Sequence, residues 1–232
     1  MPAWLLAVNL LVLLALLAFE LRSYSDQHDM PGFFGLFVRG YRRLDEKQGI
    51  RRADYVFTGS SVMKFWKTME SDLAPASVLN RAIAGAKIGE IRHHAAALIS
   101  TYSPKAVFLY AGSNDIQGKK PRSADQVLGN FRAMVEELRA RDPAIQVYFV
   151  SILVAPAKAR LRNRAEIERA NQLVREHCEG TEGLHFVDLT PDFTTKSGAP
   201  KAEYFTWDKI HLTPAGYEIW KRRIRPLVTP AE

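Results

Sequence analysis

Short apolar runs alternate with helix-like segments along most of this chain, and this alternation limits the folds that it can adopt. The runs are rich in β-branched and aromatic residues, which favours buried strands, while the segments between them have apolar residues at helical spacing. Parallel strands need a long crossover, which a helix usually supplies. The pattern therefore predicts a parallel sheet with helices on both faces. The five predicted strands are 55–58, 78–79, 107–110, 147–152 and 185–187.

Four segments are predicted to be helices of this domain. The last begins at Thr213-Pro214, where a hydroxyl N-cap is followed by proline at the first helical position. We expect it to run to about Arg225, where Pro226 stops it. The other three helices are marked by Ile88, Ile91, Ala95 and Leu98, by Val127, Leu128, Phe131, Val135 and Leu138, and by Ile167, Ala170, Leu173 and Val174.

The predicted fold is an α/β domain over residues 54–228, a three-layer, doubly wound parallel sheet of about five strands in the flavodoxin-like order 2-1-3-4-5. The chain has 232 residues, of which 47% are hydrophobic, enough for one sizeable core. In such folds ligands bind beyond the carboxyl ends of the strands. Chemistry is therefore expected in the segments that directly follow the strands.

An uncharged apolar run from Ala3 to Phe19 precedes this domain. At about 1.5 Å per residue it reaches the short limit for crossing hydrocarbon. No Lys or Arg precedes the run and a poor cleavage site follows it, which disfavours a cleaved signal peptide. We expect residues 1–20 to form an N-terminal apolar helix that anchors the chain in a membrane. Arg22 and later basic residues favour a cytoplasmic domain only weakly, so the membrane face stays open.

Residues 21–53 are predicted to be an amphipathic tether between the anchor and the domain. Aromatic and aliphatic residues over 33–38 are followed by Arg39, Arg42 and Arg43. Such a pattern suits a segment at the lipid headgroup surface. Packing of the same apolar residues on the main domain is an equal alternative.

Four of the loops carry residues suited to acyl-transfer chemistry. Ser61 follows the first predicted strand, Gly85 the second and Asn114 the third. Asp208 and His211, three residues apart, precede the last helix, so that a carboxylate can orient an imidazole. Alone, the serine has an ordinary explanation as a helix cap, the glycine and the asparagine as turn residues, and Asp-x-x-His as a common coincidence. Together they supply a nucleophile, a base, a carboxylate and donors for an oxyanion.

These residues resemble the blocks of the GDSL-type (SGNH) serine esterase and lipase superfamily, over about residues 54–228. The Ser, Gly, Asn and His for which that family is named correspond here to Ser61, Gly85, Asn114 and His211. The more specific matches are Gly-Ser-Asn-Asp at 112–115 and Asp-x-x-His at 208–211.

The first block departs from the usual Gly-Asp-Ser because Ser60 stands in the place of the aspartate. It resembles a subgroup in which Gly-Ser-Ser precedes a basic residue and a tryptophan, here Lys64 and Trp66. Trp66 and Trp207 flank the predicted nucleophile and His/Asp turns, and we expect both to pack in the core rather than to line an acyl pocket.

The resemblance implies a serine hydrolase that cleaves carboxylic esters through an acyl-enzyme, with no metal or organic cofactor. Ser61 would attack, His211 would act as the base and Asp208 would orient it. The oxyanion would be met by the backbone N–H groups of Ser61 and Gly85 and by the Asn114 amide. The implied partner is a small-molecule or lipid ester, and family analogy favours an extracytoplasmic domain.

Net charge, the absence of certain motifs and the cysteine count exclude some other function classes, while several alternatives stay open. A non-catalytic lipid- or glycan-binding member of the same fold stays open, as do an O-acetyl-sugar esterase and a thioesterase. The net charge of +7 suits an anionic surface, but no nucleic-acid motif and no nucleotide-binding Gly-rich motif accompanies it. The single Cys178 excludes an intramolecular disulfide and a multi-thiolate metal site. The oligomeric state stays open.

Overall fold

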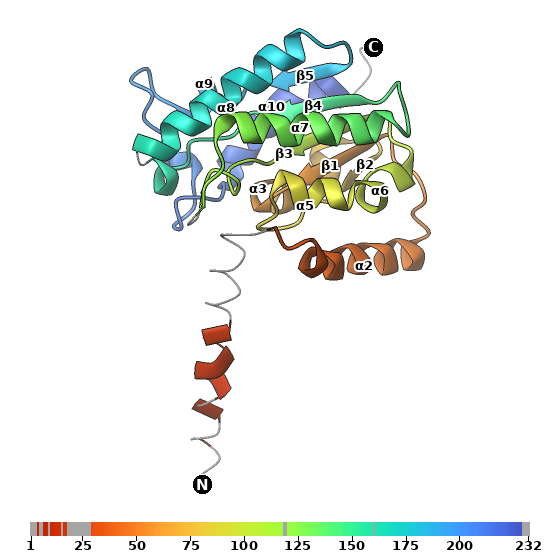
Figure 1. Ribbon diagram of the computed structural model, residues 1–232, viewed down its shortest axis with the longest axis horizontal. Helices are drawn as coiled ribbons and strands as arrows, with labels where there is room; N and C mark the ends of the chain where they lie inside the picture. Colours follow the sequence, from red (N-terminus) through yellow and green to blue (C-terminus); the bar gives the residue numbers. More distant parts are fainter. Residues whose placement is uncertain are drawn as a thin grey trace.

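Figure 1 shows a computed structural model of the chain, which describes residues 4, 7–8, 10–14, 16–17, 29–117, 120–159 and 161–228. One parallel sheet lies between two layers of helices, which confirms the predicted three-layer α/β fold. The strands are β1 (Tyr55–Gly59), β2 (Val78–Asn80), β3 (Ala106–Tyr110), β4 (Gln146–Val150) and β5 (Leu184–Val187).

The order of the strands is β2-β1-β3-β4-β5, as predicted, and every pair is parallel. Tyr55 at the start of β1 is paired with Val78 on one side and with Ala106 on the other. The carboxyl ends of β2, β1 and β3 therefore lie next to one another at one edge of the sheet.

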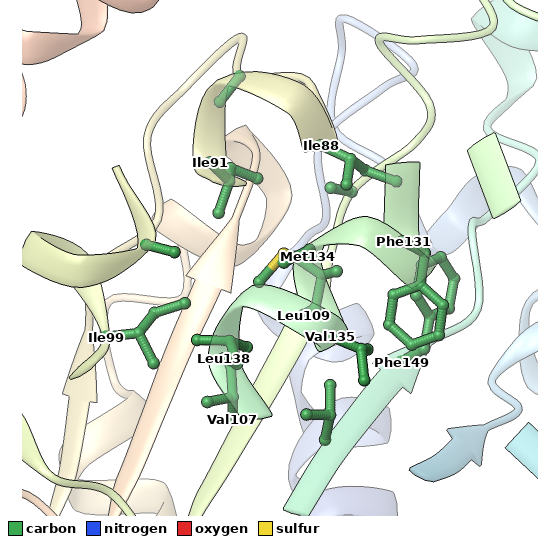
Figure 2. Packing of buried hydrophobic residues seen from close by; sticks show 14 of the residues in the cluster. Ile88, Ile91, Ile99, Val107, Leu109, Phe131, Met134, Val135, Leu138 and Phe149 are labelled. Carbon is green, nitrogen blue, oxygen red and sulfur yellow. The ribbon is translucent and has the colours of Figure 1, made fainter. Parts of the chain in front are cut away.

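Successive side chains of the strands enter two separate cores, one on each face of the sheet. In β3, Val107 and Leu109 point into the first core, while Phe108 and Tyr110 point into the second. Figure 2 shows part of the first core, in which Ile88 and residues of the helix over 124–139, such as Phe131 and Leu138, pack on the sheet. The first core is covered by α5 (Ile88–His93), α6 (Ala95–Leu98), η1 (Ser100–Tyr102), α7 (Ala124–Arg139) and α8 (Leu161–Glu179), and the second by α3 (Ser61–Lys64), α4 (Met69–Leu73), α9 (Thr190–Phe193) and α10 (Pro214–Val228).

Two of the predicted helices differ from the observed ones. The first is interrupted at His94. The ring Nε2 of His94 lies 2.7 Å from the carbonyl oxygen of Pro31, the first residue of the helix over residues 31–48. The last continues through Pro226 to Val228, so the predicted stop is wrong. Proline removes only one backbone donor so close to the helix end, and the burial of Val228 keeps the final turn in place.

Helix α2 (Pro31–Gln48) forms an outer layer on the domain and has two apolar faces. Phe34 and Val38 are buried in the first core, as the packing alternative predicts. Phe33, Leu36 and Phe37 point away from the domain and are 42%, 56% and 41% exposed. Packing therefore accounts for two of the five apolar side chains over residues 33–38 and leaves the other three on the surface.

A buried ion pair holds the C-terminal half of α2 against the domain. Asp45 pairs with Arg81, which directly follows β2, and the Tyr102 hydroxyl donates a second hydrogen bond to Asp45. Arg81 Nε also donates to the Tyr102 hydroxyl over 2.9 Å. Tyr41 lies one turn earlier and donates to the Ala82 carbonyl over 2.6 Å. The segment that was expected to be a tether is thus bound to the turn after β2, although the predicted boundaries at residues 20 and 53 stay predictions.

The predicted anchor, residues 1–20, lies partly outside the described residues. Those that are described between residues 4 and 17 are helical and exposed. Among the helices that the structure describes, none combines the length and the apolar character needed to span a bilayer. Anchoring by this segment stays a prediction.

Removing the Asp45 carboxylate leaves the buried Arg81 guanidinium without its anion. We therefore expect Asp45→Ala to lower the free energy of unfolding by about 3 kcal/mol or more, measured by urea denaturation. Glu46→Ala, at the exposed neighbouring position, is the control and is expected to change it by less than about 0.5 kcal/mol. A loss below about 1 kcal/mol for Asp45→Ala would contradict the docking role of this ion pair.

Candidate active site

The turn between β1 and α3 places Ser61 at the carboxyl edge of the sheet. Gly59 has a φ of +140°, and a Cβ atom at this position would lie 2.0 Å from the Tyr110 carbonyl oxygen. Only glycine allows β1 to pass so close to β3. The next residue, Ser60, donates its N–H to the same carbonyl over 2.9 Å. The chain then turns into α3, and Ser61 is the first residue of that helix.

The structure brings Ser61, His211 and Asp208 into one hydrogen-bonded row. Ser61 Oγ lies 2.8 Å from His211 Nε2, and His211 Nδ1 lies 2.5 Å from Asp208 Oδ2. The tautomer that carries its proton on Nδ1 satisfies both contacts, because it donates to the carboxylate and accepts from the hydroxyl. This is the geometry of a nucleophile, its base and the group that orients the base.

The second oxygen of Asp208 is fixed by three donors from its own loop. Oδ1 accepts from Thr206 Oγ1 at 2.8 Å, from Ile210 N at 2.9 Å and from His211 N at 3.0 Å. Desolvation alone raises the pKa of Asp208, but the hydrogen bonds from His211, Ile210 and Thr206 outweigh it and hold the pKa well below its usual range. Asp208 therefore stays ionised at neutral pH and well below it.

Packing between α3 and α10 keeps the serine turn and the histidine loop together. Tyr217 in α10 donates to the Val62 carbonyl over 2.7 Å, and its ring stacks on Trp66 with the centroids 6.1 Å apart. Phe65 lies edge-on to the His211 ring, 4.8 Å between centroids. Trp66 is buried, as expected, and these contacts show that it supports the turn that carries Ser61.

Gly85 and Asn114 lie on the two neighbouring turns, after β2 and β3. Gly85 has a φ of +82°, a conformation that favours glycine. Asn114 Nδ2 donates one hydrogen to the Ala86 carbonyl over 3.2 Å, which leaves it a second N–H. The next residue, Asp115, accepts from Ile88 N over 3.2 Å. These two bonds tie the turn after β3 to the turn after β2, which fixes both of the predicted oxyanion elements relative to each other.

Ion pairs connect the turn after β3 to the residues that precede α2. Arg122 Nη1 lies 2.7 Å from Asp115 Oδ1, and its Nη2 lies 2.6 Å from Asp29 Oδ2. Burial raises the pKa of Asp115, and the Arg122 guanidinium opposes this. Glu90, also buried, accepts from the backbone N–H groups of Lys87 and Met30, both over 2.7 Å. Asp29 and Met30, which lead into α2, are thus bound to residues that follow the candidate oxyanion turns.

Two side chains near the site differ from what the sequence indicates. Trp207 is 94% exposed, so the prediction that it packs in the core is wrong. It lies on the turn closed by the hydrogen bond from Lys209 N to the Thr206 carbonyl, and a turn projects its side chains outward. Lys158, for which the sequence gives no functional signal, is buried and donates to Ser113 Oγ over 3.2 Å. A lysine in a loop gives no signal of burial, so sequence patterns could not have found it.

Comparisons with known proteins agree with this arrangement. A family model described as the GDSL-like Lipase/Acylhydrolase family matches residues 57–219. Platelet-activating factor acetylhydrolase IB subunit alpha1 of Bos taurus is 27% identical over 185 residues, which cover 72% of this chain and 71% of that protein.

Solved structures share the fold. A Streptococcus pneumonia protein named as a platelet activating factor superposes with a TM-score of 0.77 and 22% identity, over 93% of this chain and 99% of its own. A GDSL-like lipase of Bacteroides thetaiotaomicron superposes with a TM-score of 0.66 and 22% identity, over 83% of this chain and 98% of its own. Because the family model covers more than half of the sequence, this chain belongs to the GDSL-like lipase/acylhydrolase family and is a carboxylester hydrolase.

Proposed function

We propose that the protein is a serine esterase in which Ser61 forms an acyl-enzyme, and that its substrate is a short-chain acyl ester of a lipid. The observation that supports the serine mechanism best is the row of hydrogen bonds from Ser61 Oγ through His211 to Asp208. A binding protein does not need an activated hydroxyl, so the row favours catalysis over the non-catalytic alternative.

In the first half-reaction Ser61 Oγ attacks the carbonyl carbon of the ester, and its proton passes to His211 Nε2. The imidazolium that forms is stabilised by the ionised Asp208. The tetrahedral intermediate then breaks its bond to the alcohol oxygen, and His211 returns the proton to that leaving alkoxide. Ser61 is left as the acyl ester.

In the second half-reaction water repeats the sequence. His211 takes a proton from the water as the oxygen attacks the acyl carbonyl, and it then returns the proton to Ser61 Oγ as the acid leaves. Both intermediates carry an oxyanion, for which we propose three donors: Ser61 N, Gly85 N and Asn114 Nδ2. Two observations support them, namely the position of Ser61 at the first turn of a helix and the fixed Asn114 side chain.

The relatives and the surface near the site support a lipid ester as the substrate. The mammalian relative is named as an acetylhydrolase of platelet-activating factor, which favours a short acyl group. Phe65, whose ring lies against that of His211, and Trp207, which precedes Asp208 in the sequence, both expose aromatic surface. Exposed aromatic rings suit contact with a lipid or with the boundary of a bilayer.

We further propose that the domain works at a membrane surface, with residues 1–20 as the anchor. The outer face of α2 supports this, because Phe33, Leu36, Phe37 and Leu44 are all exposed there and lie at helical spacing. Exposed arginines, such as Arg39, lie on the same helix and match the anionic headgroups of a bilayer.

Covalent labelling tests the nucleophile and separates the enzyme from the non-catalytic alternative. We expect a fluorophosphonate to label the wild-type chain once, on the peptide that contains Ser61, and not to label Ser61→Ala. Ser60→Ala, the adjacent serine, is the matched control and is expected to keep the label. Equal labelling of Ser61→Ala, or no labelling of the wild type, would contradict the serine mechanism.

Loss of the proposed oxyanion amide should slow the chemistry without unfolding the domain. We expect Asn114→Ala to lower kcat on p-nitrophenyl acetate by about 10²–10³-fold, because the developing negative charge loses one donor. KM and the thermal midpoint should change little. A kcat within about twofold of the wild type would remove Asn114 from the oxyanion site.

The substrate class is tested with the full chain bound to vesicles of phosphatidylcholine and phosphatidylglycerol. We expect hydrolysis of an acetylated lysophospholipid in these vesicles to fall in Phe37→Ser, because the outer face of α2 loses apolar contact. Hydrolysis of p-nitrophenyl acetate should not change, and Leu227→Ser, on the opposite layer and 37% exposed, should affect neither. Faster turnover of acetylated sugars or acyl thioesters than of the lipid would contradict the lipid assignment.

A further inference from the structure

Lys158 is a buried cation that the proposed reaction does not use. It lies at the end of the turn η2 (Pro156–Lys158), which follows β4, and only 6% of its surface is exposed. Its ammonium Nζ donates to Ser113 Oγ over 3.2 Å. Within the part of the chain that the structure describes, no carboxylate forms an ion pair with it. Desolvation lowers the pKa of Lys158 to about 8.

Burying an ammonium group without a carboxylate opposes folding, because the charge loses its hydration shell. Lysine is rarely buried in proteins unless it is paired. An apolar side chain of the same length would fill the same space at no such cost. The position of Lys158 therefore points to a role in the site rather than in the stability of the core.

The place of η2 in the structure indicates that role. Ser113, whose Oγ accepts the hydrogen bond from Lys158, is itself buried and directly precedes Asn114. On its other side η2 is bonded to the loop of the base, since Ala157 N donates to the Lys209 carbonyl over 3.0 Å. Lys209 directly follows Asp208. This single turn thus contacts both the candidate oxyanion turn and the loop that carries the Asp/His pair.

We propose that Lys158 is a positioning residue of the hydrolase, which holds the turn of Asn114 in place through its hydrogen bond to Ser113 Oγ. This rests on the proposed function of Asn114 as an oxyanion donor. The Asn114 side chain is bonded at one hydrogen to the Ala86 carbonyl, so the direction of its second N–H depends on the backbone beneath it. Lys158 holds that backbone through the Ser113 side chain. A donor that is fixed before the reaction needs no reorganisation in the transition state.

The test compares variants that break this hydrogen bond from either side. Lys158→Met removes the donor and keeps the length of the side chain, while Ser113→Ala removes the acceptor. Each is expected to lower kcat on p-nitrophenyl acetate by about 10–100-fold with KM unchanged, because a small displacement of a reacting geometry has effects of this size. Lys201→Met is the matched control: its Nζ donates to the Asp192 carbonyl over 2.9 Å, away from the site, and kcat should not change.

A double-mutant cycle separates positioning from a general loss of structure. In the Asn114→Ala background, Lys158→Met should cause no further loss of kcat, because the donor that it positions is already absent. The double variant Lys158→Met/Ser113→Ala should be no slower than the slower single variant. A full multiplicative loss in the Asn114→Ala background, an increase in KM alone, or an unchanged kcat in Lys158→Met would each overturn the proposal.

The rate at which a fluorophosphonate labels Ser61 gives a second readout that does not depend on the natural substrate. Its phosphoryl oxygen requires the same donors, so Lys158→Met should slow labelling by about the same factor as it lowers kcat. Where Lys158→Met fails to fold, as judged by circular dichroism, Ser113→Ala alone tests the bond because it deletes a single oxygen. Normal labelling of the wild type and of both variants would overturn only the role of Lys158. No labelling of the wild type would overturn the serine mechanism and this inference with it.

Discussion

The parallel arrangement of β2, β1 and β3 is the constraint on which the candidate site depends. Parallel strands all end at the same edge, so the turns with Ser61, Gly85 and Asn114 are neighbours although they are far apart in the sequence. The close passage of Gly59 beside the Tyr110 carbonyl fixes the first of these turns. Helix α10 then brings the Asp/His loop against α3 through the contacts of Tyr217 with that helix. The site is therefore a consequence of sheet order and of packing on one face.

Much of this arrangement could be predicted from the sequence because it depends on regular patterns. Strand order, strand positions and the family follow from alternating apolar runs and from short blocks of chemistry-bearing residues. The approach of His211 to Ser61 agrees with the resemblance of these blocks to the family, in which they supply the base and the nucleophile.

The features that the sequence did not predict depend on contacts between distant segments. Nothing in the local sequence around Lys158 indicates that this lysine is buried and hydrogen-bonded to Ser113. The two apolar faces of α2 could not be separated without knowing that Asp45 meets Arg81. The break at His94 and the passage of α10 through Pro226 likewise reflect local packing that overrides propensity. In each case packing against distant segments decides what the local sequence leaves open.

The structure of the full chain after reaction with diethyl p-nitrophenyl phosphate tests the central claim most directly. The account predicts phosphorus bonded to Ser61 Oγ, with a phosphoryl oxygen within hydrogen-bonding distance of Ser61 N, Gly85 N and Asn114 Nδ2. His211 Nε2 should lie beside Ser61 Oγ or an ester oxygen of the adduct. An adduct on another residue, or a phosphoryl oxygen that points into solvent away from Gly85 and Asn114, would contradict it.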